Sequence, residues 1–215
     1  MPNSLLFIPD ISGYTNFIQT TEIEHAEHVI AEILELLIAS NTENLQLAEI
    51  EGDALFFFKE GSIPTKDSLL KQIETMYTAF YSHLKMLEKN RICTCNACAT
   101  APKLKLKIIV HSGEIQFLKV QGSRKPFGNA VITAHRLLKN SINGNNYALL
   151  SEDLSNAIGL KIEDKNRLFQ FHPLSDQYDG VQVNYFYASI DITKLNLLPF
   201  SSPLTVNFNN TPHTV

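Results

Sequence analysis

The segment LLFIPDISGYTNFI, residues Leu5 to Ile18, decides how this chain is interpreted. Its first residues are apolar, too few to span a membrane and too apolar for a surface loop, so they predict a buried strand. The strand runs into Asp10 and turns at once through Ser12-Gly13. A carboxylate at the end of a buried strand costs free energy unless a cation or hydrogen-bond donors meet it. Two interpretations are open at this point: Asp10 caps the next helix, or it binds a metal ion.

The composition limits the class of protein. The chain has 215 residues, 44% of them hydrophobic and 19% charged, with a formal net charge of −4, which suits one domain with a real core and no nucleic-acid partner. The sequence shows no secretory leader pattern and no long apolar run, so we expect no membrane partner. The three cysteines all lie between Cys93 and Cys98, which argues against a secreted disulfide framework and favours a cytoplasmic protein.

Hydrophobic periodicity predicts an α+β fold. Helices are expected around residues 26–37 and 67–89 and from Asn129, with a hairpin over 45–58 that turns at Glu51-Gly52-Asp53. A second hairpin is expected over 103–120, turning at Ser112–Glu114, and further strands follow at 147–150, 167–174 and 181–190. This order favours a ferredoxin-like βαββαβ core, an antiparallel sheet with helices on one face, plus an extra hairpin and C-terminal strands. One domain over 1–190 and a tail over 191–215 are expected.

Asp53, in the turn of the first hairpin, is the natural companion of Asp10. In a ferredoxin-like core, the end of the first strand and the turn of the adjacent hairpin lie side by side. Two carboxylates brought together repel each other unless they share cations, and hard oxygen ligands suit Mg²⁺ with a phosphate substrate. The segment between them, ISGYT at residues 11–15, presents backbone N–H groups at the start of a helix and suits a phosphate group.

Four segments in order resemble the catalytic domain of the class III nucleotidyl cyclases, the adenylate and guanylate cyclase family. They are DISGYT at 10–15, GDA at 52–54, IIVHSGE at 108–114 and GNAVITAHR at 128–136. Each segment is weak evidence by itself, but their order and spacing match the family over roughly residues 4–189. The chain is therefore identified as a divergent, bacterial-type member with a cyclase homology domain.

The resemblance implies a set of site residues and a reaction. It assigns metal binding, for Mg²⁺ or Mn²⁺, to Asp10, Ile11 and Asp53, and a catalytic role to Arg136. It assigns phosphate binding to the loop Ser12, Gly13, Tyr14 and Thr15. It implies a nucleoside triphosphate whose 3′-hydroxyl attacks the α-phosphorus as pyrophosphate leaves. It also implies a head-to-tail homodimer with its active sites at the interface.

Several positions depart from the family pattern. The family's transition-state asparagine falls on Ile132, and its phosphate-binding lysine falls near Gln177. The base-reading position falls on Glu49, as in guanylate cyclases, and its usual partner on the dimer helix falls on Lys125. Glu49 is also compatible with an ordinary solvent-facing strand residue. These departures predict slow turnover, or a degenerate domain that only binds a nucleotide or dimerises for regulation.

The cysteines lie in an insertion at about residues 91–102 that the family pattern lacks. Cys93, Cys95 and Cys98 form C-x-C-x-x-C, which suits a soft-metal site for Zn²⁺ or iron. The alternative is a reduced loop without metal. If a metal binds there, the chain is a candidate metal or redox sensor on a cyclase scaffold.

Overall fold

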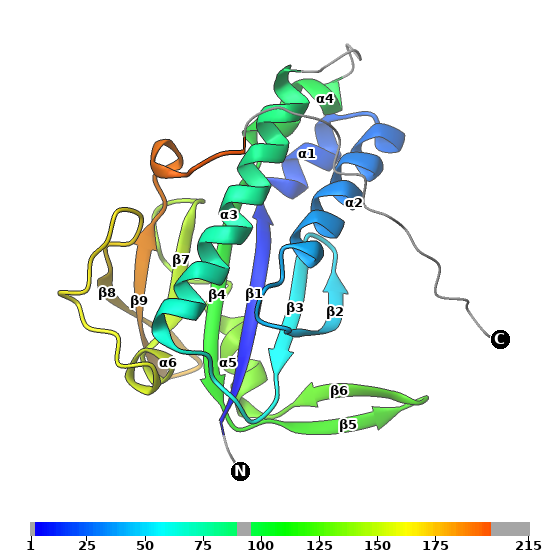
Figure 1. Cartoon of the computed structure of the whole chain (residues 1–215). Coiled ribbons are helices and arrows are strands. Elements are labelled where there is room, and N and C mark those ends of the chain that lie inside the picture. Colours follow the sequence, from blue (N-terminus) through cyan, green and yellow to red (C-terminus); the bar gives the residue numbers. More distant parts are fainter. Residues whose placement is uncertain (1–2, 90–95, 199–215) are drawn as a thin grey trace.

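A computed structural model describes residues 3–89 and 96–198 of the chain, and Figure 1 shows how its helices and strands are arranged. Its main element is a seven-stranded sheet with the strand order β2-β3-β1-β4-β7-β9-β8, and a two-stranded ribbon, β5–β6, extends away from this sheet. The strands are β1 Ser4–Ser12, β2 Gln46–Glu51, β3 Ala54–Lys59, β4 Lys105–Gly113, β5 Gln116–Val120, β6 Ser123–Phe127, β7 Tyr147–Ser151, β8 His172–Tyr178 and β9 Val181–Ser189.

The helices pack against both faces of the sheet. Helices α2 (Ile23–Ala39) and α3 (Lys66–Lys89) cover one face, and α5 (Asn129–Leu137) packs on the opposite face (Figure 1). The shorter elements are α1 Tyr14–Thr20, α4 Asn96–Thr100, α6 Glu152–Ala157 and the single 3-10 turns η1 Ala101–Lys103 and η2 Ile192–Lys194. The expectation of helices on one face therefore holds for α2 and α3, while α5 lies on the other side.

The predicted fold class is confirmed. The elements β1, α2, β2, β3, α3 and β4 build the ferredoxin-like core, because β1 lies between β3 and β4 and is antiparallel to both, with β2 beyond β3. Beyond β4, strand β7 joins in parallel and β9 and β8 extend the sheet. The core strands thereby bring the end of β1 next to the turn between β2 and β3.

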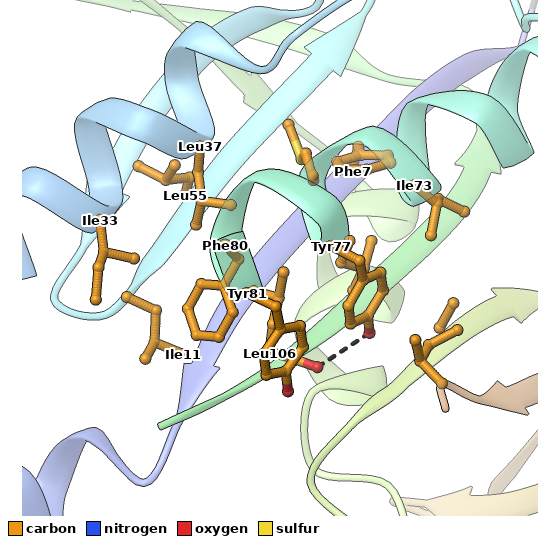
Figure 2. Packing of buried hydrophobic residues seen from close by; sticks show 14 of the residues in the cluster. Phe7, Ile11, Ile33, Leu37, Leu55, Ile73, Tyr77, Phe80, Tyr81 and Leu106 are labelled. Atoms are coloured by element: carbon orange, nitrogen blue, oxygen red, sulfur yellow. Dashed lines mark hydrogen bonds between the residues drawn. The ribbon is translucent and has the colours of Figure 1, made fainter. Parts of the chain in front are cut away.

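The alternation of β1 explains why both faces are covered. Leu5 and Phe7 point to the face with α2 and α3, and Leu6 and Ile8 point to the face with α5. Figure 2 shows the larger core, where Phe80 and Tyr77 of α3 pack among the strands. The buried Tyr77 hydroxyl lies 3.0 Å from the Leu106 carbonyl oxygen of β4 and 2.7 Å from that of Tyr147 in β7, which anchors α3 to the centre of the sheet.

The prediction of a hairpin over 103–120 is wrong. Strand β4 pairs with β1 and β7, whereas β5 pairs with β6 in the separate ribbon. The physical reason is burial: Ile108, Ile109 and Val110 are buried on alternate faces, so β4 is a central strand with both edges already paired. The chain then leaves the sheet at Gly113, where an added Cβ would lie 2.7 Å from the Ala130 Cβ of α5.

Some sequence expectations fall outside the described residues. Cys93 and Cys95 lie there, as does the side chain of Cys98, so the soft-metal site stays a prediction. The tail beyond residue 198 also lies outside the described residues. Over residues 3–89 and 96–198, none of the helices has the length and apolar character needed to cross a bilayer.

Candidate functional site

Asp10 and Asp53 meet at one end of the core strands, as the ferredoxin-like arrangement predicts. Asp10 is the register partner of Ala54, the residue after Asp53, and the backbone N–H of Ile11 donates to the Asp53 carbonyl oxygen at 3.1 Å. The turn between the strands is tight because Gly52 adopts a left-handed φ of 68°. Asp10 alternates with Leu6 and Ile8, so its side chain belongs to the face of the sheet on which α5 packs.

A residue that the sequence analysis missed, Lys107, completes this pair of carboxylates. Lys107 is the register partner of Asp10 on β4, its Nζ lies 3.5 Å from Asp10 Oδ2, and it donates to the Leu138 carbonyl oxygen at 3.3 Å. The alternation of lysines before Ile108 is visible in the sequence. The register that places Lys107 opposite Asp10 is a property of the assembled sheet.

The electrostatics of the site favour a bound cation. Burial raises the pKa of Asp10 to about 6, Lys107 opposes this rise, and the Asp53 carboxylate adds to it. Burial also raises the pKa of Asp53, against the opposing effects of a hydrogen bond to its own backbone and of Lys107. One ammonium thus faces two carboxylates whose ionised forms burial disfavours, so with both carboxylates ionised one negative charge is left unpaired.

The available ligands suit Mg²⁺ or Mn²⁺ with a phosphate substrate. No cluster of three or more His, Cys, Asp or Glu side chains with metal-binding geometry occurs in the described part of the chain. Two carboxylates and a nearby backbone carbonyl leave the remaining positions to water and phosphate oxygens. That donor set is typical of Mg²⁺ sites, where few protein ligands hold the ion.

The loop from Ser12 to Thr15 follows directly from Asp10. Ser12 is the last residue of β1 and the register partner of Lys105 on β4, whose ammonium lies 5.9 Å from the centre of the Tyr81 ring. Gly13 adopts a φ of 92° as the cap of α1, a conformation that favours glycine, and its carbonyl accepts from the Phe17 N–H at 3.0 Å. Phe17 is buried and anchors α1, which fixes the turn beside Asp10.

The catalytic candidate on α5 does not reach the aspartates of its own chain. Arg136 donates to the carboxylate of Asp179 in the turn between β8 and β9. Ile132, one turn earlier on α5, is 50% exposed, and Gln177 lies exposed on β8. The site within one chain therefore consists of the carboxylates, Lys107 and the glycine turn.

The two base-reading candidates contact each other. Lys125 Nζ lies 3.0 Å from both carboxylate oxygens of Glu49. The expectation that Lys125 lies on the dimer helix is wrong, because Lys125 lies on β6. The helix begins only after Gly128, whose φ of 129° breaks the chain direction, while the preceding residues pair with β5. Arg124 makes a parallel contact to Glu60, at 2.7 and 2.8 Å, so adjacent residues fasten the ribbon to the β2–β3 hairpin.

The two histidines close to the motifs differ in their surroundings. His111 is buried with its Nδ1 2.7 Å from Ser151 Oγ, and burial lowers its pKa to about 4, so it is neutral and structural. His135 bridges α5 and β2: its Nε2 lies 3.0 and 3.1 Å from the carboxylate oxygens of Glu51, and its Nδ1 lies 2.9 Å from the Val131 carbonyl oxygen. Glu51 is 84 positions from His135 in the sequence, and the sequence analysis did not join the two residues.

The sequence of this chain matches one protein family and is similar to one mycobacterial protein. Residues 30–147 match the family described as "Protein of unknown function (DUF2652)". The chain is 27% identical over 152 residues to the uncharacterized protein Rv2561/Rv2562 of Mycobacterium tuberculosis (strain ATCC 25618 / H37Rv), which covers 71% of this chain and 68% of that protein.

The solved structures to which this chain is similar include nucleotidyl cyclase catalytic domains. The catalytic core of a rhodopsin-guanylyl cyclase with converted specificity, in complex with ATPαS, superposes with a TM-score of 0.64 at 16% identity, covering 88% of this chain and 96% of that one. A non-canonical dimeric guanylyl cyclase domain of the RhoGC fusion protein from the aquatic fungus Blastocladiella emersonii gives a TM-score of 0.58 at 16% identity, covering 89% of this chain and 98% of that one. At these identities the likeness establishes a cyclase-like fold.

Proposed function

The chain belongs to the family described as protein of unknown function (DUF2652), and from its site we propose that it is a metal-dependent nucleotidyl cyclase with low turnover. The observation that carries this proposal is the meeting of Asp10 and Asp53 beside Lys107 at the end of the core strands. A cyclase-like fold supports it, because in that fold the resemblance assigns both aspartates to metal binding. A cytoplasmic location is part of the proposal, since nucleoside triphosphates and reduced cysteines belong to that compartment.

In the proposed complex, Asp10, the Ile11 carbonyl and Asp53 hold Mg²⁺ or Mn²⁺, and the substrate is a nucleoside triphosphate. A bound ion there would neutralise phosphate charge and orient the triphosphate. Lys107 supplies a further positive charge, and the turn from Ser12 to Thr15 offers N–H groups to phosphate oxygens. In the reaction, a bond forms between O3′ and the α-phosphorus, the bond to pyrophosphate breaks, and the 3′-hydroxyl proton is released. The protein contributes positioning and charge stabilisation.

We also propose a homodimer, in which α5 of one subunit completes the site of the other. Arg136 is turned toward Asp179 within its own chain, so a role at the phosphates needs a second copy. Exposed apolar side chains on β2, the ribbon and α5 give this surface the character of an interface. They are Leu47, Ile50, Leu118, Val120, Phe127 and Ile132. One of the similar structures, described as a non-canonical dimeric guanylyl cyclase domain, shows that a domain of this fold can dimerise.

Glu49 and Lys125 are the proposed contacts to the base. A carboxylate acceptor and an ammonium donor lie side by side on the ribbon side of β2, 3.0 Å apart. Such a pair complements a base edge on which a hydrogen-bond donor adjoins an acceptor. A base bound there would replace the contact that each side chain now makes with the other.

Low turnover follows from the substituted positions. Ile132 carries no hydrogen-bond donor where the family has asparagine, and Gln177 stands near the position of a lysine. Loss of one preorganised donor typically lowers the rate by about 10²–10³. The exposure of Ile132 also favours a second candidate function, a nucleotide-binding module that dimerises for regulation without turnover.

The deciding experiment combines binding and product formation. Titration calorimetry with Mn²⁺ and each of ATP, GTP, CTP and UTP should show binding to the wild type and loss of about tenfold or more in affinity in Asp10→Ala and Asp53→Ala. Asp164→Ala is the matched control, because Asp164 pairs with Lys66 on the face away from the site and should leave affinity unchanged.

The same samples are assayed for cyclic nucleotide and pyrophosphate. A small but measurable rate that rises in Ile132→Asn supports the cyclase. Binding without any product in both proteins identifies the regulatory module instead. Equal affinity of the wild type and both aspartate variants would remove the proposed metal–nucleotide site altogether.

A further inference from the structure

The helix α5 is fastened to a row of residues that crosses the sheet at the level of the site. The strand registers align Glu51, Ala54, Asp10, Lys107 and Tyr147 on β2, β3, β1, β4 and β7. Alternation along β1, β4 and β7 puts this row on the α5 face, since Ile8, Ile109 and Leu149 belong to the core on that side. The row includes Asp10, the acid of the proposed metal site.

Polar contacts connect the C-terminal half of α5 and the residues after it to this row. His135 reaches Glu51 at one end, the Leu138 carbonyl accepts from Lys107 in the middle, and the Asn140 amide lies 2.8 Å from the Tyr147 hydroxyl at the other end. The first of these contacts is made to the carboxylate of Glu51, two residues before Asp53. It therefore lies next to the part of the site that depends on a hairpin turn.

Contacts at both ring nitrogens hold His135 in this arrangement. Its Nδ1 lies 2.9 Å from the Val131 carbonyl oxygen on its own helix. Its Nε2 lies 3.0 Å from a carboxylate oxygen of Glu51 on β2. The ring edge packs against Phe56 of β3 with centroids 5.1 Å apart, which leaves His135 little freedom to turn away.

We propose that His135 is a positioning residue that holds the Gly52–Asp53 turn at a fixed distance from α5; the inference rests on the proposed function, because Asp53 and α5 are the parts that it aligns. Glu51 directly precedes the turn, and the Asp53 carbonyl accepts from the Ile11 N–H on the other side. The turn is thus tied to β1 by a backbone hydrogen bond and to α5 by the His135–Glu51 contact. Without the second tie, the Asp53 carboxylate would sample positions away from Asp10.

The test compares His135→Phe, which keeps a ring against Phe56 but removes both ring nitrogens, with His83→Phe as a matched control. His83 on α3 lies 3.4 Å from Glu32 on α2, a histidine–glutamate pair that does not touch the site. The first readout is hydrogen exchange of the Ile11 amide, which reports whether the turn stays on β1. The second is affinity for Mn²⁺ with a nucleoside triphosphate, measured by calorimetry.

We expect Ile11 to exchange faster in His135→Phe than global stability accounts for, and affinity to fall about tenfold, within the usual range of coupling between sites. His83→Phe should change exchange only as far as global stability changes. His135→Gln, which keeps one donor toward Glu51, should recover part of both effects and covers the case in which His135→Phe does not fold.

Two results would overturn the inference. One is Ile11 exchange that follows global stability equally in the His135 and His83 variants. The other is an affinity for Mn²⁺ with a nucleoside triphosphate that is the same in His135→Phe as in a wild type that binds. A wild type that binds no metal–nucleotide would defeat the proposed function, and the exchange readout would still decide the role of His135.

Discussion

Asp10 is a residue whose ionised form the fold disfavours and whose proposed function requires that form. Its side chain is 15% exposed and burial raises its pKa to about 6, while the nearby Lys107 offsets only part of that rise. A carboxylate in such surroundings lowers the stability of the protein without a bound cation, and a cation that binds there stabilises the carboxylate. Residues of this kind are typical of functional sites, where stability is lost in exchange for activity.

The first prediction concerns Asp10→Asn and pH. Because the folded pKa of Asp10, about 6, lies above its ordinary value of 3.8, the folded state binds the proton more tightly than the unfolded state. Its contribution to stability is therefore greatest below about pH 4 and is lost as pH rises through about 6. The upward shift of the Asp10 pKa corresponds to about 3 kcal/mol at most. Asp10→Asn should thus raise the free energy of unfolding at neutral pH by about 1–3 kcal/mol. It should also make the free energy of unfolding depend less on pH between pH 4 and 6.

Urea denaturation across this pH range, with and without Mn²⁺ and nucleotide, makes the measurement. Mn²⁺ with nucleotide should stabilise the wild type and not the variant. Asp164→Asn is the control of opposite sign, because its hydrogen bond from Lys66 lowers the pKa of Asp164 and favours its ionised form. A wild type whose stability rises between pH 4 and 6 to the same extent as that of Asp10→Asn would contradict the assigned role of Asp10.

At the scale of elements, the position of α5 depends on how closely it approaches the end of β4. Gly113 is the last residue of β4, and a Cβ there would lie 2.7 Å from the Ala130 Cβ, closer than real Cβ atoms approach. The glycine of the segment HSGE is therefore needed for packing, and not for a left-handed turn. This contact sets the depth of the N-terminal half of α5, while the His135–Glu51 contact sets its C-terminal half.

The second prediction tests this contact with Gly113→Ala and Ala130→Gly. Overpacking typically costs about 1–3 kcal/mol, so Gly113→Ala should lower the free energy of unfolding by that amount. Ala130→Gly is also destabilising by itself, by roughly 0.5–1 kcal/mol, because glycine weakens a helix. In the double variant the clash is absent, so its loss should be smaller than the sum of the two single losses. Strictly additive losses would mean that the two positions do not meet.

At the scale of the whole molecule, the ribbon contacts the β2–β3 hairpin, and both expose apolar residues. The ribbon is held in place by the Arg124–Glu60 and Lys125–Glu49 contacts, and Figure 1 shows it extending away from the sheet. Phe127 at the end of β6 and Ile132 on α5 are each 50% exposed. A rigid ribbon that presents such side chains suits the proposed contact with a second copy of the chain.

The third prediction concerns this surface. Phe127→Glu should shift the protein from dimer to monomer in analytical ultracentrifugation, because a charge in a dehydrated interface is costly. Ile162→Glu is the matched control, since Ile162 is 51% exposed and lies between α6 and β8, away from the ribbon. A wild type that is already monomeric at all concentrations, or equal behaviour of the two variants, would contradict the dimer.

The sequence by itself determined the local elements and the meeting of the two aspartates. Periodicity of the apolar residues predicted α3 and the hairpin around Gly52-Asp53, and the buried run before Asp10 predicted β1. These features depend on neighbours within a few residues, so a pattern of period 3.6 or 2 contains them. The pairing of Asp10 with Asp53 then followed from one topological assumption, the ferredoxin-like core, which the strand order confirms.

Only the tertiary structure decided what lies between and around those aspartates. Lys107 faces Asp10 because of a strand register, Lys125 lies on a ribbon because β4 has no free edge for β5, and His135 meets Glu51 across 84 positions of sequence. Local periodicity says which face of an element is apolar, but not which strand is its neighbour or at what register. Those choices are made when distant segments compete to bury their apolar faces, and the polar contacts of the candidate site follow from the outcome.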